Sequence, residues 1–325
     1  MAANPFPNGV RLMVAGTSGG AVNQWAQAFL PVLGRLLPPG TRVAKENAIG
    51  NDGVTGANQF AVRAAPDGTT ALLVPGSAAT AWLVGDPRVH FDTANWMPVM
   101  DGISPGVAVG RVPRSALELT HALRIAASGP AGPELPVLIA LQLLGTDFIP
   151  VFGLGRPENA RAALVAGAVD LIFLHGEGVP QQMHALMAAG MHVLFSLGAL
   201  DATGQWRRDP ELPDVPTFAE VSQRLLGRVP VGPMATAWRA ASAAAALHFA
   251  LVLPQLTPPD IVALWRNIAG ALVRDPTVRA LASATAVSAQ AGPAANASTA
   301  AVAVDAAALL ALRSWLGRRF GWRQS

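Results

Sequence analysis

An apolar run near the start of the chain, Leu12 to Ala15, breaks into a turn made of glycine, serine and threonine. Beyond the turn, apolar residues recur at helical spacing from Trp25 to Leu33. This change of period predicts a strand, a tight loop and a helix. Glycine lets a ligand approach the backbone, and a helix begins with unpaired N–H groups at its positive end. The junction can therefore hold an anion without a charged side chain, or it can be a plain strand–helix connection with no ligand.

The same alternation of strand, loop and helix continues along the chain. Residues 41–44 and 70–74 have the pattern of strands, and residues 57–65 have the pattern of a helix. A loop rich in glycine and asparagine, residues 46–56, precedes that helix, and residues 75–80 form a loop after the second strand. This order predicts an α/β fold with mainly parallel sheets, whose ligands bind at the carboxyl ends of the strands.

The length and composition limit the class of protein. A chain of 325 residues is long enough for two domains. Charged residues make up only 13% of it, against about 25% in a typical protein. The sequence contains no cysteine, which excludes disulfides, thiolate metal sites and a cysteine nucleophile. That composition is compatible with either the periplasm or the cytoplasm.

The high isoelectric point, about 10.7, does not indicate nucleic-acid binding. Lys45 is the only lysine and there is no tyrosine or cysteine, so few groups titrate between histidine and arginine. The formal net charge is only +3 and the arginines are scattered along the chain. We therefore expect no nucleic acid among the partners.

Several short motifs follow one another in the order of a known family. They are Glu46-Asn47 with its spaced glycines, Pro66-Asp67-Gly68, Trp96-Met-Pro98-Val99, Leu212-Pro-Asp-Val-Pro-Thr-Phe-Ala-Glu220 and Asp275-Pro276-Thr-Val278. Together they resemble the substrate-binding proteins of tripartite tricarboxylate transporters, also called the Bug family, over roughly residues 9–320. The resemblance implies a two-lobed periplasmic binding fold, type II-like, that closes as a Venus flytrap. Residues 1–103 and 227–325 would form the first lobe and residues 104–226 the second, with the cleft between them.

The resemblance also implies a function. It implies reversible capture of a small organic carboxylate by lobe closure, delivery to the membrane permease subunits of the transporter, and a periplasmic location for a protein whose signal peptide is not part of this sequence. No catalysis, cofactor or metal is implied, and we expect a monomer. The ligand-binding residues expected in the cleft are Gly16, Thr17, Ser18, Gly19, Gly20, Asn23, Ser77, Ala78, Thr80, Ser128, Gly129, Ala131, Val151, Phe152 and His175.

The departures from the family pattern bear on the ligand. Asn23 stands where the family has an acidic residue, and Val151-Phe152 stands where it has Tyr-Lys. His248 replaces a tryptophan, and residues 234–246 are extra sequence with the composition of an alanine-rich helix. In the second-lobe loop, Pro130, Pro133 and Pro136 remove N–H groups that would otherwise cradle a carboxylate. Either the ligand is smaller or more apolar at its far end, such as an aromatic or short-chain carboxylate, or the chain is a drifted paralogue whose ligand is unknown.

Other functions have weaker support in the sequence. No two of the six histidines have the spacing of a metal-ligand pair. His175-Gly-Glu177 follows a predicted strand. The sequence leaves three interpretations of it open: a pair of metal ligands, a hydrogen-bond donor that lines the cleft, or a surface turn. Residues 16–20 fit the Gly-x-Ser-x-Gly elbow of hydrolases, but no later Asp and His stand at recognisable strand ends to complete a triad. A sensory or interaction paralogue of the same fold, which signals ligand occupancy to a partner, is the alternative to transport.

The C-terminal stretch, residues 297–316, has apolar residues at helical spacing. Asp305 interrupts it, so it does not have the continuous apolar character of a membrane span. We expect one helix that packs on the first lobe.

Overall fold

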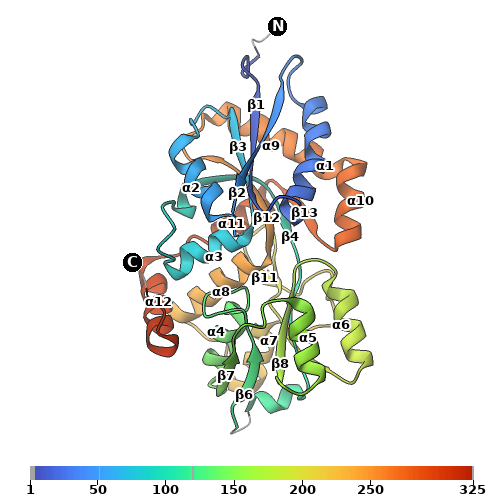
Figure 1. Cartoon of the computed structure of the whole chain (residues 1–325), viewed down its shortest axis with the longest axis vertical. Coiled ribbons are helices and arrows are strands. Elements are labelled where there is room, and N and C mark those ends of the chain that lie inside the picture. The colour runs from blue at the N-terminus through green and yellow to red at the C-terminus, as the bar shows by residue number, and fades with distance from the viewer. Residues whose placement is uncertain (1–3, 51, 119–120, 324–325) are drawn as a thin grey trace.

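The computed structural model describes residues 4–50, 52–118 and 121–323. It contains two β-sheets, one toward each end of an elongated molecule, with helices on both faces of each (Figure 1). The two-lobed α/β fold expected from the sequence is confirmed. We call the sheet that holds the N-terminal strands and its covering helices the first lobe, and the other sheet and its helices the second lobe.

The first-lobe sheet has six strands. In spatial order they are β13 (Ser288–Ala291), β4 (Trp96–Ile103), β12 (Leu247–Pro254), β3 (Thr70–Val74), β1 (Val10–Gly16) and β2 (Val43–Ile49). β1 pairs in parallel with β2 and β3, whereas β12 runs antiparallel to both β3 and β4. The strand predicted at 41–44 thus extends through the first four residues of the loop that we expected at 46–56.

The second-lobe sheet has five strands. In spatial order they are β7 (Phe148–Val151), β6 (Leu123–Ala126), β8 (Leu171–His175), β5 (Gly106–Gly110) and β9 (His192–Ser196). β6 pairs in parallel with β7 and β8, and β5 runs antiparallel to β8 and β9. Both sheets are therefore mixed rather than mainly parallel. The antiparallel strands include β4 and β5, through which the chain passes directly from one sheet to the other.

Helices cover both faces of the first-lobe sheet. They are α1 (Ala21–Leu36), α2 (Val54–Arg63), α3 (Gly76–Val84), α9 (Pro259–Arg274), α10 (Pro276–Thr285) and α11 (Pro293–Ala300). α1 buries Trp25 and Phe29, and α9 buries Trp265, in one apolar cluster with Leu73 and Phe249 of the sheet. The strand, loop and helix predicted from residues 11–33 are confirmed as β1, a glycine-rich turn and α1.

The second-lobe sheet is covered in the same way. Its helices are α4 (Leu135–Leu144), α5 (Pro157–Val165), α6 (Val179–Ala188) and α7 (Phe218–Leu226). The chain also contains a short hairpin, β10 (Ala199–Leu200) and β11 (Trp206–Arg207), and two 3-10 turns, η1 (Thr93–Asn95) and η2 (Arg114–Glu118). α7 begins with a capping box in which Thr217 and Glu220 bond each other's backbone N–H groups.

The predicted alanine-rich helix is confirmed as α8 (Pro233–Ala246), and it lies between the two lobes (Figure 1). α8 packs on α3 of the first lobe and on α4 of the second. Its alanines let the neighbouring helices approach closely, and Trp238 stacks against Phe218 with ring centroids 4.5 Å apart. One apolar cluster consequently runs without interruption from Leu72 of the first sheet to Ile125 of the second.

The C-terminal stretch corrects our prediction of a single helix. Residues 297–316 belong to two helices, α11 and α12 (Ala306–Phe320), because the Asp305 carboxylate accepts a hydrogen bond of 2.8 Å from the N–H of Ala308 and starts a new helix there. α12 also contacts both lobes instead of the first alone. Arg313 donates to the Trp82 carbonyl in the first lobe, and Arg319 donates to the Phe148 carbonyl in the second.

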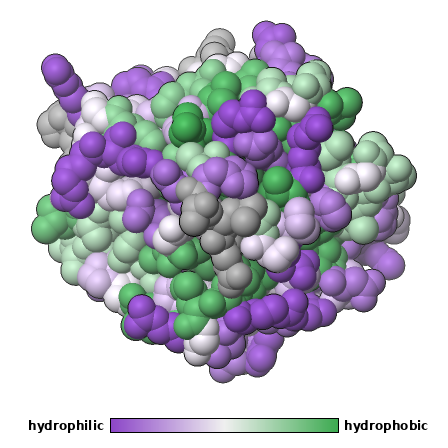
Figure 2. All heavy atoms as spheres, turned by 90° about the horizontal axis from the view of Figure 1, so that it is seen from below, coloured by the Kyte–Doolittle hydropathy of each residue, from purple (hydrophilic) through white to green (hydrophobic). Residues whose placement is uncertain are grey.

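Viewed from the end of the second lobe, hydrophilic and hydrophobic residues are interspersed over the visible face (Figure 2). Within the described ranges, no helix has both the length and the apolar character needed to cross a membrane.

A buried carboxylate lies within the first-lobe sheet. Asp101 of β4 is completely buried, and neither of its oxygens has a hydrogen-bond partner among the described residues. The hydroxyl of nearby Ser298 donates to the carbonyl of Ala294. Burial raises the pKa of Asp101 to about 7, so this side chain is an acid in the folded state at pH 5 and an uncompensated anion at pH 8.

Replacing Asp101 with asparagine should remove a pH-dependent loss in the free energy of unfolding. A carboxyl group whose pKa is higher in the folded state than in the unfolded chain contributes fully to stability below pH 4. This contribution is lost as pH rises through 7. Relative to the Asp101→Asn variant, the wild-type protein should lose about 2–3 kcal/mol of unfolding free energy between pH 5 and pH 8 in urea titrations. The exposed Asp214→Asn variant is the control, and equal pH dependence in all three proteins would contradict the burial argument.

Candidate functional site

A cavity of about 500 Å³ lies between the two lobes, below the carboxyl ends of β1 and β3. Both lobes contribute to its wall. From the first lobe and α8 the lining residues are Gly16, Thr17, Gly20, Ala21, Val22, Asp52, Pro75, Gly76, Ser77, Thr80, Ala81, Val84, Asp86, Arg88, Ser104, Ala244, Ala245, Leu247 and His248, and from the second lobe they are Ala131, Pro133, His175 and Gly176.

Two helices of the first lobe begin at the wall of this cavity. α1 follows β1 and starts after Gly20, and α3 follows β3 and starts after Pro75. Neither of these N-cap residues has a side-chain acceptor, so the N–H groups of both first turns lack a capping side chain. The positive ends of two helix dipoles therefore face one space, which is a suitable environment for an anion.

Glycine is required where these helices start. A side chain at Gly20 would collide with the Thr17 hydroxyl, and a side chain at Gly76 would collide with the carbonyl of Ala244 on α8. The loop that the sequence identified as a possible anion site thus lets the backbone reach the cavity. The region expected to be a loop at 76–80 is instead the first turn of α3, which has no helix-breaking residue after Pro75.

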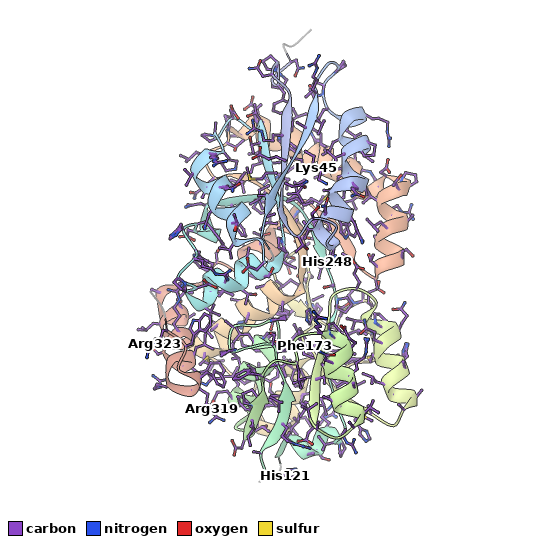
Figure 3. The ribbon with its side chains drawn as sticks, viewed as in Figure 1. Lys45, His121, Phe173, His248, Arg319 and Arg323 are labelled. Carbon is purple, nitrogen blue, oxygen red and sulfur yellow. The ribbon has the colours of Figure 1, made fainter. Side chains whose placement is uncertain are left out.

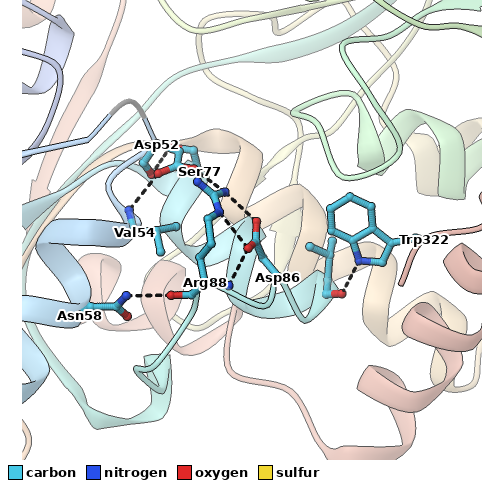
Figure 4. A network of polar contacts seen from close by, with 8 residues as sticks. Asp52, Val54, Asn58, Ser77, Asp86, Arg88 and Trp322 are labelled. Atoms are coloured by element: carbon cyan, nitrogen blue, oxygen red, sulfur yellow. Dashed lines mark hydrogen bonds and ion pairs between the residues drawn. The ribbon is translucent and has the colours of Figure 1, made fainter. Parts of the chain in front are cut away.

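The only arginine that lines the cavity in the described structure is already neutralised. Arg88 contacts Asp52 and Asp86, each through an Nη2–Oδ2 distance of 2.7 Å (Figure 4). The hydrogen bond from Arg88 lowers the pKa of Asp86, and the two carboxylates raise the pKa of Arg88. Ser77 Oγ donates to the Asp52 carbonyl at 2.9 Å, so the network joins Asp52 to α3. Its net charge is negative, and it offers no free cation to a ligand.

Two histidines from opposite lobes line the same cavity. His175 ends β8, where it stacks on Phe173 with ring centroids 5.2 Å apart, and His248 is the second residue of β12. His248 and Phe173, on which His175 stacks, both lie near the middle of the molecule (Figure 3). Burial lowers the pKa of each imidazole to about 4, and the charge of one would oppose that of the other. Both rings are therefore neutral at pH 7.

His248 has an acidic neighbour. Its Nε2 lies 3.3 Å from Glu177 Oε1, but neither atom makes an aligned hydrogen bond within the described part of the chain. The His248 side chain is only 8% exposed. Burial raises the pKa of Glu177 as well as lowering that of His248, which keeps this contact from becoming a full ion pair. The imidazole is a buried polar group at the cavity wall without a hydrogen-bonding partner there.

The structure brings about half of the expected site residues to this cavity. Those that line it are Gly16, Thr17, Gly20, Ser77, Thr80, Ala131 and His175. Ser18 and Gly19 are at the exposed tip of the same loop, and Ala78 is buried in the core behind α3. Asn23 is one turn further into α1, where its side-chain oxygen accepts a hydrogen bond from Lys45.

The other expected residues lie away from the cavity wall. Val151 and Phe152, expected to replace a polar wall, are not among the lining residues, and Phe152 packs instead on Phe320 of α12 with ring centroids 5.9 Å apart. Ser128 and Gly129 belong to the loop after β6, and Ser128 donates its hydroxyl to Glu134 at 2.7 Å. Their role as ligand contacts stays a prediction.

Sequence reasoning missed several lining residues. Asp86 and Arg88 belong to the turn after α3, and no local pattern distinguishes them from ordinary surface charges. Asp52 lies in a loop that the sequence did mark, but its partner in the structure could not be inferred. His248 was noted only as a departure from the family pattern, and its burial at the cavity comes from the antiparallel return of β12.

No metal site is evident. Among the described residues, no group of three or more histidines, aspartates and glutamates is arranged to hold a metal ion.

No protein-family model matches the sequence, and no curated protein matches it. Solved structures do match. A TctC solute-binding protein from Polaromonas, without ligand, aligns with a TM-score of 0.70 and 16% identity over 95% of this chain and 98% of that one. A Rhodopseudomonas palustris protein with adipate aligns at 0.55 and 18% identity, over 95% and 96% of the two chains.

MatC from Rhodopseudomonas palustris, with bound malate, aligns with a TM-score of 0.52 and 20% identity over 95% of this chain and 98% of that chain. The chain therefore has the fold of a two-lobed solute-binding protein. Within that class, its fold is the one shared by the TctC and Bug proteins of tripartite tricarboxylate transporters, as the sequence motifs indicated.

The two buried histidines make stability depend on pH. Their pKa values are lower in the folded state than in the unfolded chain, so the unfolded chain takes up protons first as pH falls from 6.5 to 4. Each of the two histidines should therefore lower the stability of the folded state as pH falls through this window, and His248→Asn should reduce the slope by up to about 1.4 kcal/mol per pH unit. The exposed His192→Asn variant should keep the wild-type slope in urea titrations, and an unchanged slope in His248→Asn would contradict this assignment.

Proposed function

We propose that this protein is a periplasmic solute-binding protein that captures a small organic carboxylate in the cavity between its lobes and delivers it to a membrane permease. The observation that carries the proposal is the convergence of two uncapped helix N-termini, those of α1 and α3, on one cavity between the lobes. The carboxylates bound to two proteins of the same fold, malate and adipate, support this choice of ligand.

In the proposed complex, the ligand carboxylate accepts hydrogen bonds from the first N–H groups of α1 and α3. The hydroxyl of Thr17, which also lines the cavity, stands beside the start of α1 and adds a donor. Hydrogen bonds to an ionised acceptor are stronger than those between neutral groups. A few uncharged donors can therefore bind the ligand carboxylate without a free arginine.

The second lobe closes the cavity from the other side. His175 and Gly176 face the space that α1 and α3 border, and His248 faces it from the first lobe. A ligand that contacts residues of both lobes favours the closed arrangement, because only differential contacts shift the population. We take residues 1–103 and 227–325 as one moving unit and residues 104–226 as the other.

The same site supports binding rather than catalysis. Ser18, the only candidate nucleophile in the glycine-rich loop, is at the exposed loop tip and is not a lining residue of the cavity. We propose that the protein acts without a cofactor, as a monomer, and binds no nucleic acid.

One observation favours a second candidate, a sensory role. α8 and α12 pack on both lobes and form one continuous apolar cluster with them, which restrains lobe opening. A sensor needs only a small change on ligand binding, whereas delivery to a permease needs the site to open. Crosslinking to the transporter permease in the presence of ligand separates the two roles, because a sensor should not be captured.

Carboxylates should raise the melting temperature. A ligand at about a hundred times its dissociation constant adds roughly 2.7 kcal/mol to the folded state, which a thermal-shift screen of aliphatic and aromatic acids detects. Thr17→Val should weaken binding of the best acid about tenfold, because it removes a hydroxyl donor to an ionised group. Ser288→Ala, on an exposed edge strand, should leave it unchanged. The absence of a thermal shift with every acid, or equal affinity in Thr17→Val, would count against the proposal.

A further inference from the structure

The second-lobe loop that faces the cavity already holds a carboxylate, and it comes from the protein itself. The loop runs from the end of β6 to the start of α4. Within it, Glu134 Oε2 accepts 2.7 Å and 3.1 Å hydrogen bonds from the hydroxyl and the backbone N–H of Ser128. Glu134 is only 5% exposed, although it is a charged residue type. The donors of this loop are thus directed at an internal anion.

The loop is packed tightly around that carboxylate. A side chain at Gly132 would run into both Ser128 Oγ and Glu134 Oε2. On the other side, a Cβ at Gly155 would lie 2.5 Å from the Ser128 Cβ. Glycine at both positions leaves space for the Glu134 carboxylate, and the enclosure has no room for a second one.

Most of the remaining donors in the loop are used or absent. The N–H of Ala127 donates to the Val151 carbonyl at 3.1 Å, and that of Gly132 donates to the Gly129 carbonyl at 3.2 Å. Pro130 and Pro133 have no N–H at all. The side chains that this loop presents to the cavity, Ala131 and Pro133, are apolar.

The buried Glu134 and the apolar side chains of this loop make the second-lobe side of the cavity unfavourable for an anion. A ligand carboxylate placed there would find an apolar wall backed by another carboxyl group, and bringing two carboxylates together raises the free energy of the charged forms. The Asp52–Arg88–Asp86 network adds a net negative charge on the first-lobe wall. The positions suited to an anion are therefore the two helix ends of the first lobe, where backbone N–H groups face the cavity.

We propose that Glu134 is a specificity-determining residue that fills the anion position of the second lobe, so that the cavity accepts monocarboxylates with an uncharged far end and excludes dicarboxylates. This inference rests on the proposed function, since it assigns the substrate class of the same site. Glu134 acts as a positioning residue, because it shapes the loop without contacting the acid that binds at the first lobe.

Matched acids test the inference by isothermal titration calorimetry. Hexanoate and adipate have the same chain length and differ by one carboxylate, as do benzoate and terephthalate. The wild-type protein should bind the monoacid of at least one pair ten times more tightly than the diacid. Glu134→Ala empties the cradle and frees the Ser128 donors, so the diacid should gain at least tenfold while the monoacid changes little.

Two further variants keep the test decisive. Glu134→Gln retains the shape and the hydrogen bonds of Glu134 while removing its charge, so it should fold even where Glu134→Ala does not, and it should tighten diacid binding at least threefold. Glu211→Gln, on an exposed loop, should behave as wild type. Circular dichroism melts establish that each variant is folded.

The outcomes separate this inference from the function it rests on. Diacid binding as tight as monoacid binding in the wild-type protein, or an unchanged ratio in folded Glu134→Gln, overturns the role of Glu134 and leaves carboxylate capture standing. Binding of no acid from either pair, nor of any acid in the thermal-shift screen, overturns the proposed function and this inference together.

Discussion

The packing of α8 between the two lobes is the constraint on which the rest of the structure depends. Its alanines allow α3 and α4 to approach from opposite sides, and its last turn lies against Gly76 at the cavity wall. Because the apolar cluster is continuous across this helix, it connects the helix ends of the first lobe with the β8 end of the second lobe. α12 reinforces that connection through Arg313 and Arg319, which donate to carbonyls of different lobes.

The charged and titratable side chains near the cavity are paired, neutral or already hydrogen-bonded, and this determines where an anion can bind. Arg88 is paired with two aspartates, both histidines are neutral because they are buried, and Glu134 takes the donors of Ser128. What remains for an anion is the set of backbone N–H groups at the starts of α1 and α3. A site of this kind discriminates by position and shape rather than by a strong single charge.

Sequence reasoning recovered the parts that local patterns encode. The change of period around Gly16–Gly20 marked β1, its loop and α1, and the alanine-rich composition of residues 234–246 marked α8. It failed where contacts are long-range. The Arg88–Asp52 pair, the antiparallel return of β12 that buries His248, and the packing of Phe152 on α12 have no local signature. The Asp305 cap was visible in the sequence, yet helical spacing on both sides of it obscured the break.

The most direct test of the account is the crystal structure of the protein grown with a saturating acid that binds in solution, hexanoate being the first choice. The account predicts its carboxylate within hydrogen-bond distance of first-turn N–H groups of α1 and α3, with its alkyl chain toward Ala131 and Pro133 and the Ser128–Glu134 contact intact. A carboxylate bound to Arg88, or one that displaces Glu134 from Ser128, would contradict it.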